Sequence, residues 1–78
     1  MTERRLSVDA KRIGSRFLAV RRERGLSRRE LSAAAGVTMT TVAALERGER
    51  LPNLYTVIVL CNALCADIAE LLPQEEHA

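Results

Sequence analysis

The sequence predicts a small all-α protein, a compact bundle of five helices with a helix-turn-helix at its centre. Three observations favour this fold class. Apolar residues recur every three or four positions along most of the chain, no segment alternates strictly between apolar and polar residues, and glycine and proline together occupy only six of the 78 positions. A chain of this length buries only roughly 60% of its unfolded surface, so we expect a partner to contribute to its stability.

Four of the five predicted helices have a recognisable beginning. The helices are expected over residues 9–24, 28–35, 39–46 and 54–64, with a short fifth helix that starts at Asp67. The side chains that cap their N-termini are expected to be Ser27, Thr38, Asn53 and Asp67, and the first and last of these begin capping boxes because a glutamate follows three residues later. Glycines end the first three helices, since glycine adopts the left-handed conformation without steric cost.

The apolar stripes of these helices predict the core. From the N-terminus, the inward side chains are Ala10, Ile13, Phe17, Val20, Leu31 with Ala34 or Ala35, Val37, Val42, Leu45, Leu54, Val57, Ile58, Cys61, Leu64, Ile68, Leu71 and Leu72. We expect one domain over residues 9–73. Residues 1–8 are predicted to form a partly disordered arm, and residues 74–78 an acidic tail.

Several function classes find no support. No apolar run approaches the ~18–20 residues that cross a bilayer, and the N-terminus lacks the apolar segment of a signal peptide, so we expect a cytoplasmic protein. No catalytic or phosphate-binding motif occurs, and the single histidine is His77 near the chain end, so neither an enzyme nor a cofactor is expected. Cys61 and Cys65 have no further metal ligands in view and are predicted to be reduced, packed thiols.

Charge is distributed unevenly along the chain. Residues 1–29 contain ten basic and three acidic residues, whereas residues 51–78 contain four acidic and no basic residues. The formal net charge of +2 therefore conceals +7 in the first segment and −4 in the last. Such an asymmetry is typical of a nucleic-acid-binding face. Two aromatic residues are too few for a platform that stacks single-stranded bases. Double-stranded DNA is the partner expected from the helix-turn-helix described next.

Two of the predicted helices form a helix-turn-helix. A turn over residues 36–38 joins the short helices at 28–35 and 39–46, and the second helix of such a pair can lie in the major groove. Its outer face carries only small or slim side chains, namely Met39, Thr40, Thr41, Ala43 and Ala44. This face either packs on protein or enters a DNA groove about 12 Å wide, and Met39 has the further alternative of packing in the core.

The segment from Ile13 to Leu72 resembles the lambda-repressor-like, Cro-type (XRE) helix-turn-helix family. The matching residues are Ile13-Gly14, Val20-Arg21, Gly25-Leu26-Ser27, Glu30-Leu31, Gly36-Val37-Thr38, Val42, Leu45-Glu46-Arg47-Gly48, Arg50, Pro52, Ala63-Leu64 and Leu71-Leu72. The string LERGER followed by LPNLYTV is similar to the small controller proteins of restriction–modification systems and to compact phage repressors. The resemblance implies a homodimeric transcription regulator that binds a pseudo-palindromic operator.

The resemblance also implies site residues. The residues that would meet base edges are Met39, Thr40 and Ala44, flanked by Thr41 and Ala43. The residues that would contact phosphates are Arg16, Arg28, Thr38, Arg47 and Arg50. Arg28 stands where the family usually has Gln, and Cys65 where it commonly has Gly after the fourth helix. Arg21 is a further candidate for a phosphate contact; alternatively it pairs with Glu46 or lies on a solvated helix face.

The helix at 54–64 is apolar nearly all round, which is typical of a helix buried on both sides. A chain of 78 residues is too short to cover both sides, so we predict a two-fold symmetric dimer whose interface residues are Tyr55, Val59, Leu60, Ile68 and Leu72. A single exposed patch on a monomer is the alternative. An alternative function is an antitoxin-like module that neutralises a toxin and regulates its own operon; RNA polymerase is a further candidate partner.

Overall fold

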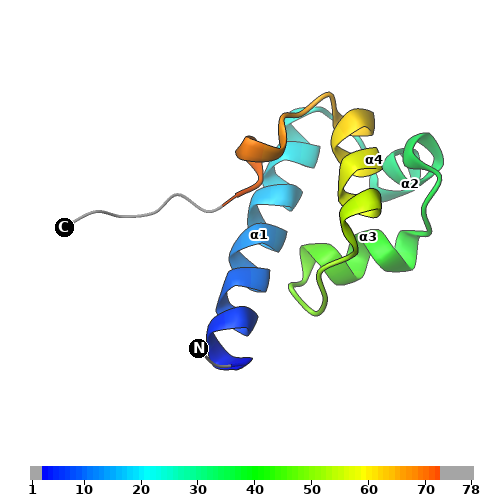
Figure 1. Cartoon of the computed structure of the whole chain (residues 1–78). Coiled ribbons are helices and arrows are strands. Elements are labelled where there is room, and N and C mark those ends of the chain that lie inside the picture. Colours follow the sequence, from blue (N-terminus) through cyan, green and yellow to red (C-terminus); the bar gives the residue numbers. More distant parts are fainter. Residues whose placement is uncertain (1–2, 73–78) are drawn as a thin grey trace.

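Four α-helices and one turn of 3-10 helix make up the computed structural model, which describes residues 3–72 and the side chains of residues 9–72. The helices are α1 (Glu3–Glu23), α2 (Arg28–Ala35), α3 (Met39–Glu46) and α4 (Leu54–Leu64), and the 3-10 turn is η1 (Ile68–Glu70). Helix α1 runs along one side of the molecule, and the three shorter helices lie together beside it (Figure 1). No helix within the described residues is both long and apolar enough to cross a membrane.

The prediction of an all-α fold is confirmed, but the fifth helix is a single 3-10 turn. Two backbone bonds of 3-10 type define it, Glu70 N to Asp67 O at 2.9 Å and Leu71 N to Ile68 O at 3.0 Å. The chain reaches Pro73 too soon for an α-helix to continue, because the residue before a proline is biased away from the α conformation. The described residues therefore contain four α-helices rather than five.

Helix α1 begins earlier than expected. It starts at Glu3, whereas the sequence pattern predicted a start at Asp9. No glycine or proline lies between these two positions, so nothing in the covalent chain interrupts the helix. The predicted arm over residues 1–8 is therefore wrong for residues 3–8. Residues 1–2 and the predicted tail at 74–78 lie outside the described residues.

The predicted N-caps are confirmed. Ser27 Oγ accepts from the Glu30 amide at 3.0 Å, and the Ser27 amide donates to Glu30 Oε1 at 2.8 Å, which completes the capping box. Thr38 and Asn53 each accept from the amide three residues later, at 3.2 and 2.9 Å. These bonds satisfy donors that a helix start leaves free, so the beginnings of α2, α3 and α4 are fixed by local chemistry.

The core of the first three helices is as predicted. The buried cluster consists of Phe17, Val20, Leu31, Val42, Leu45, Leu60, Cys61, Leu64 and Leu71. The prediction of which side of α4 faces this core was partly wrong. Leu60 is fully buried, whereas Leu54 and Ile58 are 67% and 45% exposed. Since α4 is apolar nearly all round, its pattern fits two overlapping stripes, and the structure selects the one that contains Leu60.

Gly14 is the point of closest approach between α1 and α3. A Cβ atom at this position would lie 2.2 Å from the backbone oxygen of Leu45 and 2.9 Å from that of Glu46. Only a residue without a side chain allows the two backbones to meet at this distance. This approach sets the end of α3 directly against α1, which places Glu46 beside the arginines described next.

Candidate nucleic-acid interface

The helix-turn-helix has the geometry that the sequence predicted. The amides of Gly36 and Val37 both donate to Ser32 O, at 2.9 and 3.2 Å, which closes the turn between α2 and α3. Gly36 adopts the left-handed conformation with φ of 73°. Val37 packs against the core, which anchors the turn to the rest of the domain. Helix α3 thus leaves the turn in a fixed direction.

The outer face of α3 is open to solvent. Met39 is 45% exposed, which excludes a core position for it in this chain. Thr40 is also exposed, whereas Thr41, Ala43 and Ala44 are half-buried. The Thr41 hydroxyl lies 3.0 Å from the hydroxyl of the N-cap Thr38, so these two expected contact residues are linked to each other. The five residues expected to meet base edges therefore all retain accessible surface.

A hollow of about 350 Å³ lies beside this face. Its lining residues are Thr40, Thr41, Ala44, Glu49, Arg50 and Pro52. The structure thus brings Arg50, an expected phosphate contact, next to three expected base contacts. Sequence reasoning missed Glu49 as part of this surface, although the unusual signal was present: an acid stands between two arginines in a segment expected to face phosphate.

A buried carboxylate at the end of α3 joins this helix to α1 and α2. Glu46, whose side chain is only 1% exposed, accepts from Arg21 Nε at 2.5 Å and from Arg21 Nη2 at 3.1 Å. It also accepts from Arg28 Nε at 2.8 Å. The predicted Arg21–Glu46 pair is confirmed. The contact with Arg28 was missed, because no local pattern indicates that the first residue of α2 meets the last residue of α3.

The pKa of Glu46 lies below its ordinary value of 4.5. Burial alone would raise the pKa, but hydrogen bonds and charge from Arg21 and Arg28 outweigh burial. The carboxylate therefore stays charged at neutral pH. It holds Arg28 through Nε, and the terminal nitrogens of Arg28 have no hydrogen bond to any described residue. With its side chain 40% exposed, Arg28 is oriented and still able to bind an anion.

Arg47 forms an exposed ion pair directly after α3. Its Nε donates to Glu49 Oε2 at 2.9 Å and its Nη2 to Glu49 Oε1 at 3.4 Å. Gly48, between them, has a φ of 71° and is buried against α1, where an added Cβ would lie 2.6 Å from Lys11 Cα. The loop that carries the expected phosphate contact Arg47 is therefore held on α1.

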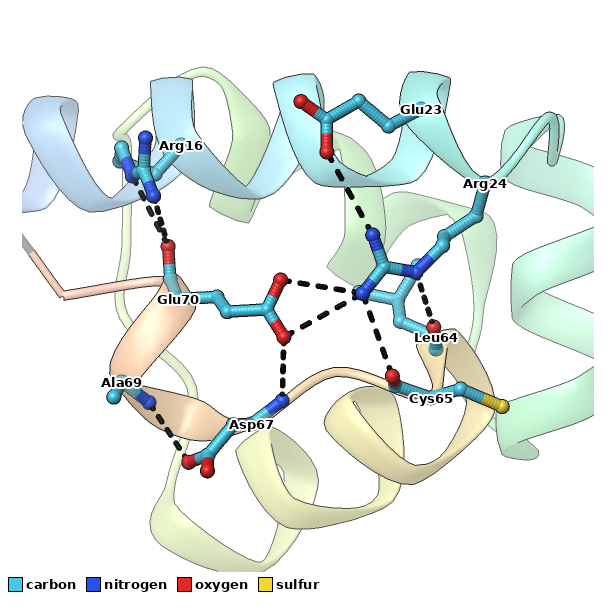
Figure 2. A network of polar contacts seen from close by, with 8 residues as sticks. All are labelled: Arg16, Glu23, Arg24, Leu64, Cys65, Asp67, Ala69 and Glu70. Carbon is cyan, nitrogen blue, oxygen red and sulfur yellow. Dashed lines mark hydrogen bonds and ion pairs between the residues drawn. The ribbon is translucent and has the colours of Figure 1, made fainter.

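Arg16 connects α1 to η1. Its Nε and Nη2 donate to the backbone oxygen of Glu70 at 3.0 and 2.7 Å, which joins α1 to η1 (Figure 2). Both bonds are charge-assisted, and they direct the guanidinium to η1 rather than to α3. In this structure Arg16 thus holds η1, and the phosphate contact expected of it stays a prediction.

Arg24 completes this network, which the sequence did not reveal. It donates to the free carbonyls of Leu64 and Cys65 at the end of α4, at 3.0 and 3.4 Å, and to the Glu70 carboxylate at 3.2 Å (Figure 2). Glu70 also accepts from the Asp67 amide at 2.9 Å, and this bond, followed by that from Arg24, holds the pKa of Glu70 below its ordinary value. The predicted Asp67–Glu70 cap is thereby confirmed and tied to α1.

Cys65 ends α4 in the left-handed conformation, with φ of 55°. It is the one non-glycine residue with positive φ in the described part of the chain. This conformation costs roughly 1 kcal/mol for a residue with a Cβ, which explains why glycine suits the position. Cys65 is exposed and Cys61 is buried, and both thiols are free. Burial raises the pKa of the Cys61 thiol.

Exposed side chains on and next to α4 and η1 form an apolar surface. We define it by its exposed side chains, which are Leu51, Leu54, Tyr55, Ile58, Ile68 and Leu72. It includes a hollow of about 300 Å³, and the core residues Phe17 and Leu45 form part of its floor. Three of the expected dimer residues, Tyr55, Ile68 and Leu72, belong to this surface. The expectation for Leu60 was wrong, because a side chain with no exposed area has nothing to offer a partner.

A short turn joins α2 to α3, the outer face of α3 is exposed, and arginines lie near the end of α3. These features define a helix-turn-helix protein of the DNA-binding class. The family model described as helix-turn-helix matches residues 18–71. The chain belongs to this family, the XRE-type helix-turn-helix transcription regulators. The family is one of regulators rather than of enzymes.

Two curated relatives share much of the chain. It is 39% identical over 67 residues to the uncharacterized HTH-type transcriptional regulator y4dJ of Sinorhizobium fredii, a match that covers 85% of this chain and 87% of that protein. It is 34% identical over 53 residues to the uncharacterized HTH-type transcriptional regulator YgzD of Bacillus subtilis, which covers 68% of this chain and 80% of the relative.

Two solved structures are similar in fold. The restriction-modification controller protein C.AhdI from Aeromonas hydrophila superposes with a TM-score of 0.80 at 31% identity, over 83% of this chain and 98% of that one. The clp gene regulator ClgR from C. glutamicum superposes with a TM-score of 0.74 at 27% identity, over 80% of each chain.

Proposed function

We propose that this chain is a sequence-specific DNA-binding transcription regulator that acts in the cytoplasm as a homodimer on a pseudo-palindromic operator. The observation that carries the proposal is the open outer face of α3, with Arg50 beside it and with Arg28 and Arg47 near the end of the helix, where Arg28 bonds to Glu46. Small side chains fit between the walls of a major groove, and arginines suit the phosphates that border it.

Reading of the DNA sequence falls to α3. Thr40 and Thr41 offer hydroxyls to base edges, while Met39, Ala43 and Ala44 offer apolar contact with thymine methyl groups. Because few of these side chains form paired hydrogen bonds to a base, part of the specificity would come from DNA shape and bending. Thr38, Arg28, Arg47 and Arg50 would set the position of the protein on the phosphates.

The apolar surface would pair with its own copy. Leu54, Ile58, Ile68 and Leu72 are large and exposed and line hollows on α4 and η1, and Val59, also on α4, is half-buried. A single-domain chain gains stability when such a surface is covered. A two-fold dimer would also place two α3 helices in successive major grooves, about 34 Å apart.

The similarity to a restriction-modification controller supports that role as one form of the proposal, and a phage-type repressor is the other. An antitoxin-like module is the alternative function, and the same apolar surface would then cover a toxin. The test is a gel shift with the DNA upstream of the chain's own gene and with random DNA of equal length. We expect tighter binding to the upstream DNA, whereas the absence of any complex at low salt would contradict the proposal.

A further inference from the structure

An acidic side chain lies within the surface that we propose to face DNA. Glu49 lines the hollow beside α3 together with Thr40, Thr41 and Ala44. Its backbone amide donates to Ala44 O at 3.0 Å, and its side chain is 56% exposed. The carboxylate therefore borders the expected base-reading residues, at a place where DNA would bring negative phosphates.

Glu49 also engages an arginine that is expected to bind phosphate. Both terminal oxygens of Glu49 accept from Arg47, at 2.9 and 3.4 Å, and both side chains are more than half exposed. Such an exposed pair contributes little to folding stability. Glu49 occupies Nε and Nη2 of Arg47, so a phosphate that approaches Arg47 through these groups would compete with the carboxylate, whose negative charge also offsets that of the guanidinium.

The loop keeps the two partners together. Gly48 joins them in the left-handed conformation and is packed so closely on Lys11 that a Cβ would overlap its backbone. The backbone between Arg47 and Glu49 is therefore held on α1. This arrangement keeps the Glu49 carboxylate within reach of Arg47.

From this juxtaposition we propose that Glu49 is an electrostatic brake on DNA binding, which competes with phosphate for Arg47. The inference rests on the proposed function, since it concerns the same DNA interface. Phosphate contacts carry no sequence information, so the brake lowers affinity for every duplex by a similar factor. A carboxylate beside a groove could instead accept from a cytosine amino group, and that role has the opposite consequence on substitution.

The test compares Glu49→Gln with the wild-type protein on two duplexes. One is selected by the wild-type protein from a randomised library, and the other has random sequence. The brake predicts that Glu49→Gln binds both about threefold more tightly at low salt. The slope of log K against log salt should steepen by about one, because one more phosphate contact forms.

Two further variants make the result specific. Glu23→Gln removes the same charge from an exposed glutamate on α1 that pairs with Arg24, and it should leave both affinities unchanged. In an Arg47→Ala background, Glu49→Gln should give no gain, because the competed cation is absent.

Three outcomes contradict the brake: unchanged affinity, a gain that persists without Arg47, and a loss confined to the selected duplex, which would indicate base reading. If selection with the wild-type protein enriched no duplex and random DNA was not bound either, the proposed function would itself be wrong, and the brake with it.

Discussion

Arg28 donates through Nε to Glu46 at 2.8 Å, which links the first residue of α2 to the last residue of α3. Glu46 is shared with Arg21, so the carboxylate faces two guanidinium groups. This contact fixes the position of the Arg28 guanidinium on the protein. An arginine held at Nε presents its two terminal nitrogens together, which suits the paired oxygens of a phosphate.

The first prediction concerns this tether. Arg28→Lys keeps the charge but removes the fork, so one ammonium cannot serve Glu46 and a phosphate in the same geometry. We expect DNA affinity to fall by roughly fivefold, about 1 kcal/mol, with the salt slope unchanged because the charge is unchanged. A salt series of binding measurements on a selected duplex checks both values. Arg29→Lys, at the exposed neighbouring position, is the matched control.

An Arg28→Lys protein that binds as tightly as the wild type would show that only charge matters at this position. The thermal midpoint of each variant should be measured alongside, since a loss of folding would lower the binding-competent fraction instead.

The second prediction concerns stability. Glu46→Gln leaves Arg21, which is only 8% exposed, without its anionic partner. Removing one member of a buried pair typically costs about 3–5 kcal/mol, whereas the exposed Arg47–Glu49 pair should contribute less than about 1 kcal/mol. Urea unfolding of Glu46→Gln and Glu49→Gln should therefore separate the two variants clearly. Equal losses in the two would contradict the structural role of Glu46.

The third prediction is a pH dependence of that same pair. Because the pKa of Glu46 is lowered on folding, its contribution to stability is fully present above the unfolded value near 4.5. The contribution is lost as pH falls through the folded pKa. The free energy of unfolding of the wild type should thus approach that of Glu46→Gln on acidification from pH 6 towards pH 3. A constant difference over this range would contradict the assigned shift.

The fourth prediction concerns the contact of α1 with α3. Gly14→Ala would place a methyl group 2.2 Å from Leu45 O, an overlap that backbone movement must relieve. We expect a loss of about 1–3 kcal/mol in the free energy of unfolding. In an open helix position the same change would gain up to about 1 kcal/mol from helix propensity. Ser15→Ala, on the exposed side of α1, is the control, and a stabilised Gly14→Ala protein would be the contrary result.

The fifth prediction tests the apolar surface. Ile58→Lys places a charge on α4 beside the hollow that Leu54 and Ile68 line. A second copy of the chain could not bury this charge, because no opposite charge would pair with it in an apolar interface. Sedimentation equilibrium should show a dimer for the wild type and a monomer for this variant. Ala33→Lys adds the same charge on the exposed part of α2 and should leave the dimer intact. A monomeric wild-type protein would contradict the homodimer.

Local chemistry made much of the fold accessible from sequence. Ser27, Thr38 and Asn53 cap helices through bonds that span three residues, so a short window contains all the information needed. The rotation of α4 could not be obtained in this way. Its apolar residues surround the helix, and only packing against the other helices decides that Leu60 faces inward while Ile58 faces outward.

In the candidate site, too, some features could be predicted from local sequence and others could not. The outer face of α3 follows from periodicity and from the position of the turn. Arg16 and Arg28 were assigned similar roles by resemblance, yet one binds the backbone of η1 and the other a buried carboxylate. Their partners, Glu70 and Glu46, lie 54 and 18 residues away in the chain. Contacts at such separations depend on the assembled fold, and no local pattern encodes them.

We propose that α3 reads DNA sequence in two symmetric half-sites. Selection of bound duplexes from a fully randomised library, with the wild-type protein and with Thr40→Ala, tests this proposal directly. We expect an inverted repeat with half-site centres about one helical turn apart, and relaxed choice at one base pair per half-site in Thr40→Ala. Recovery of no enriched sequence by the wild type, or of identical motifs by the two proteins, would contradict it.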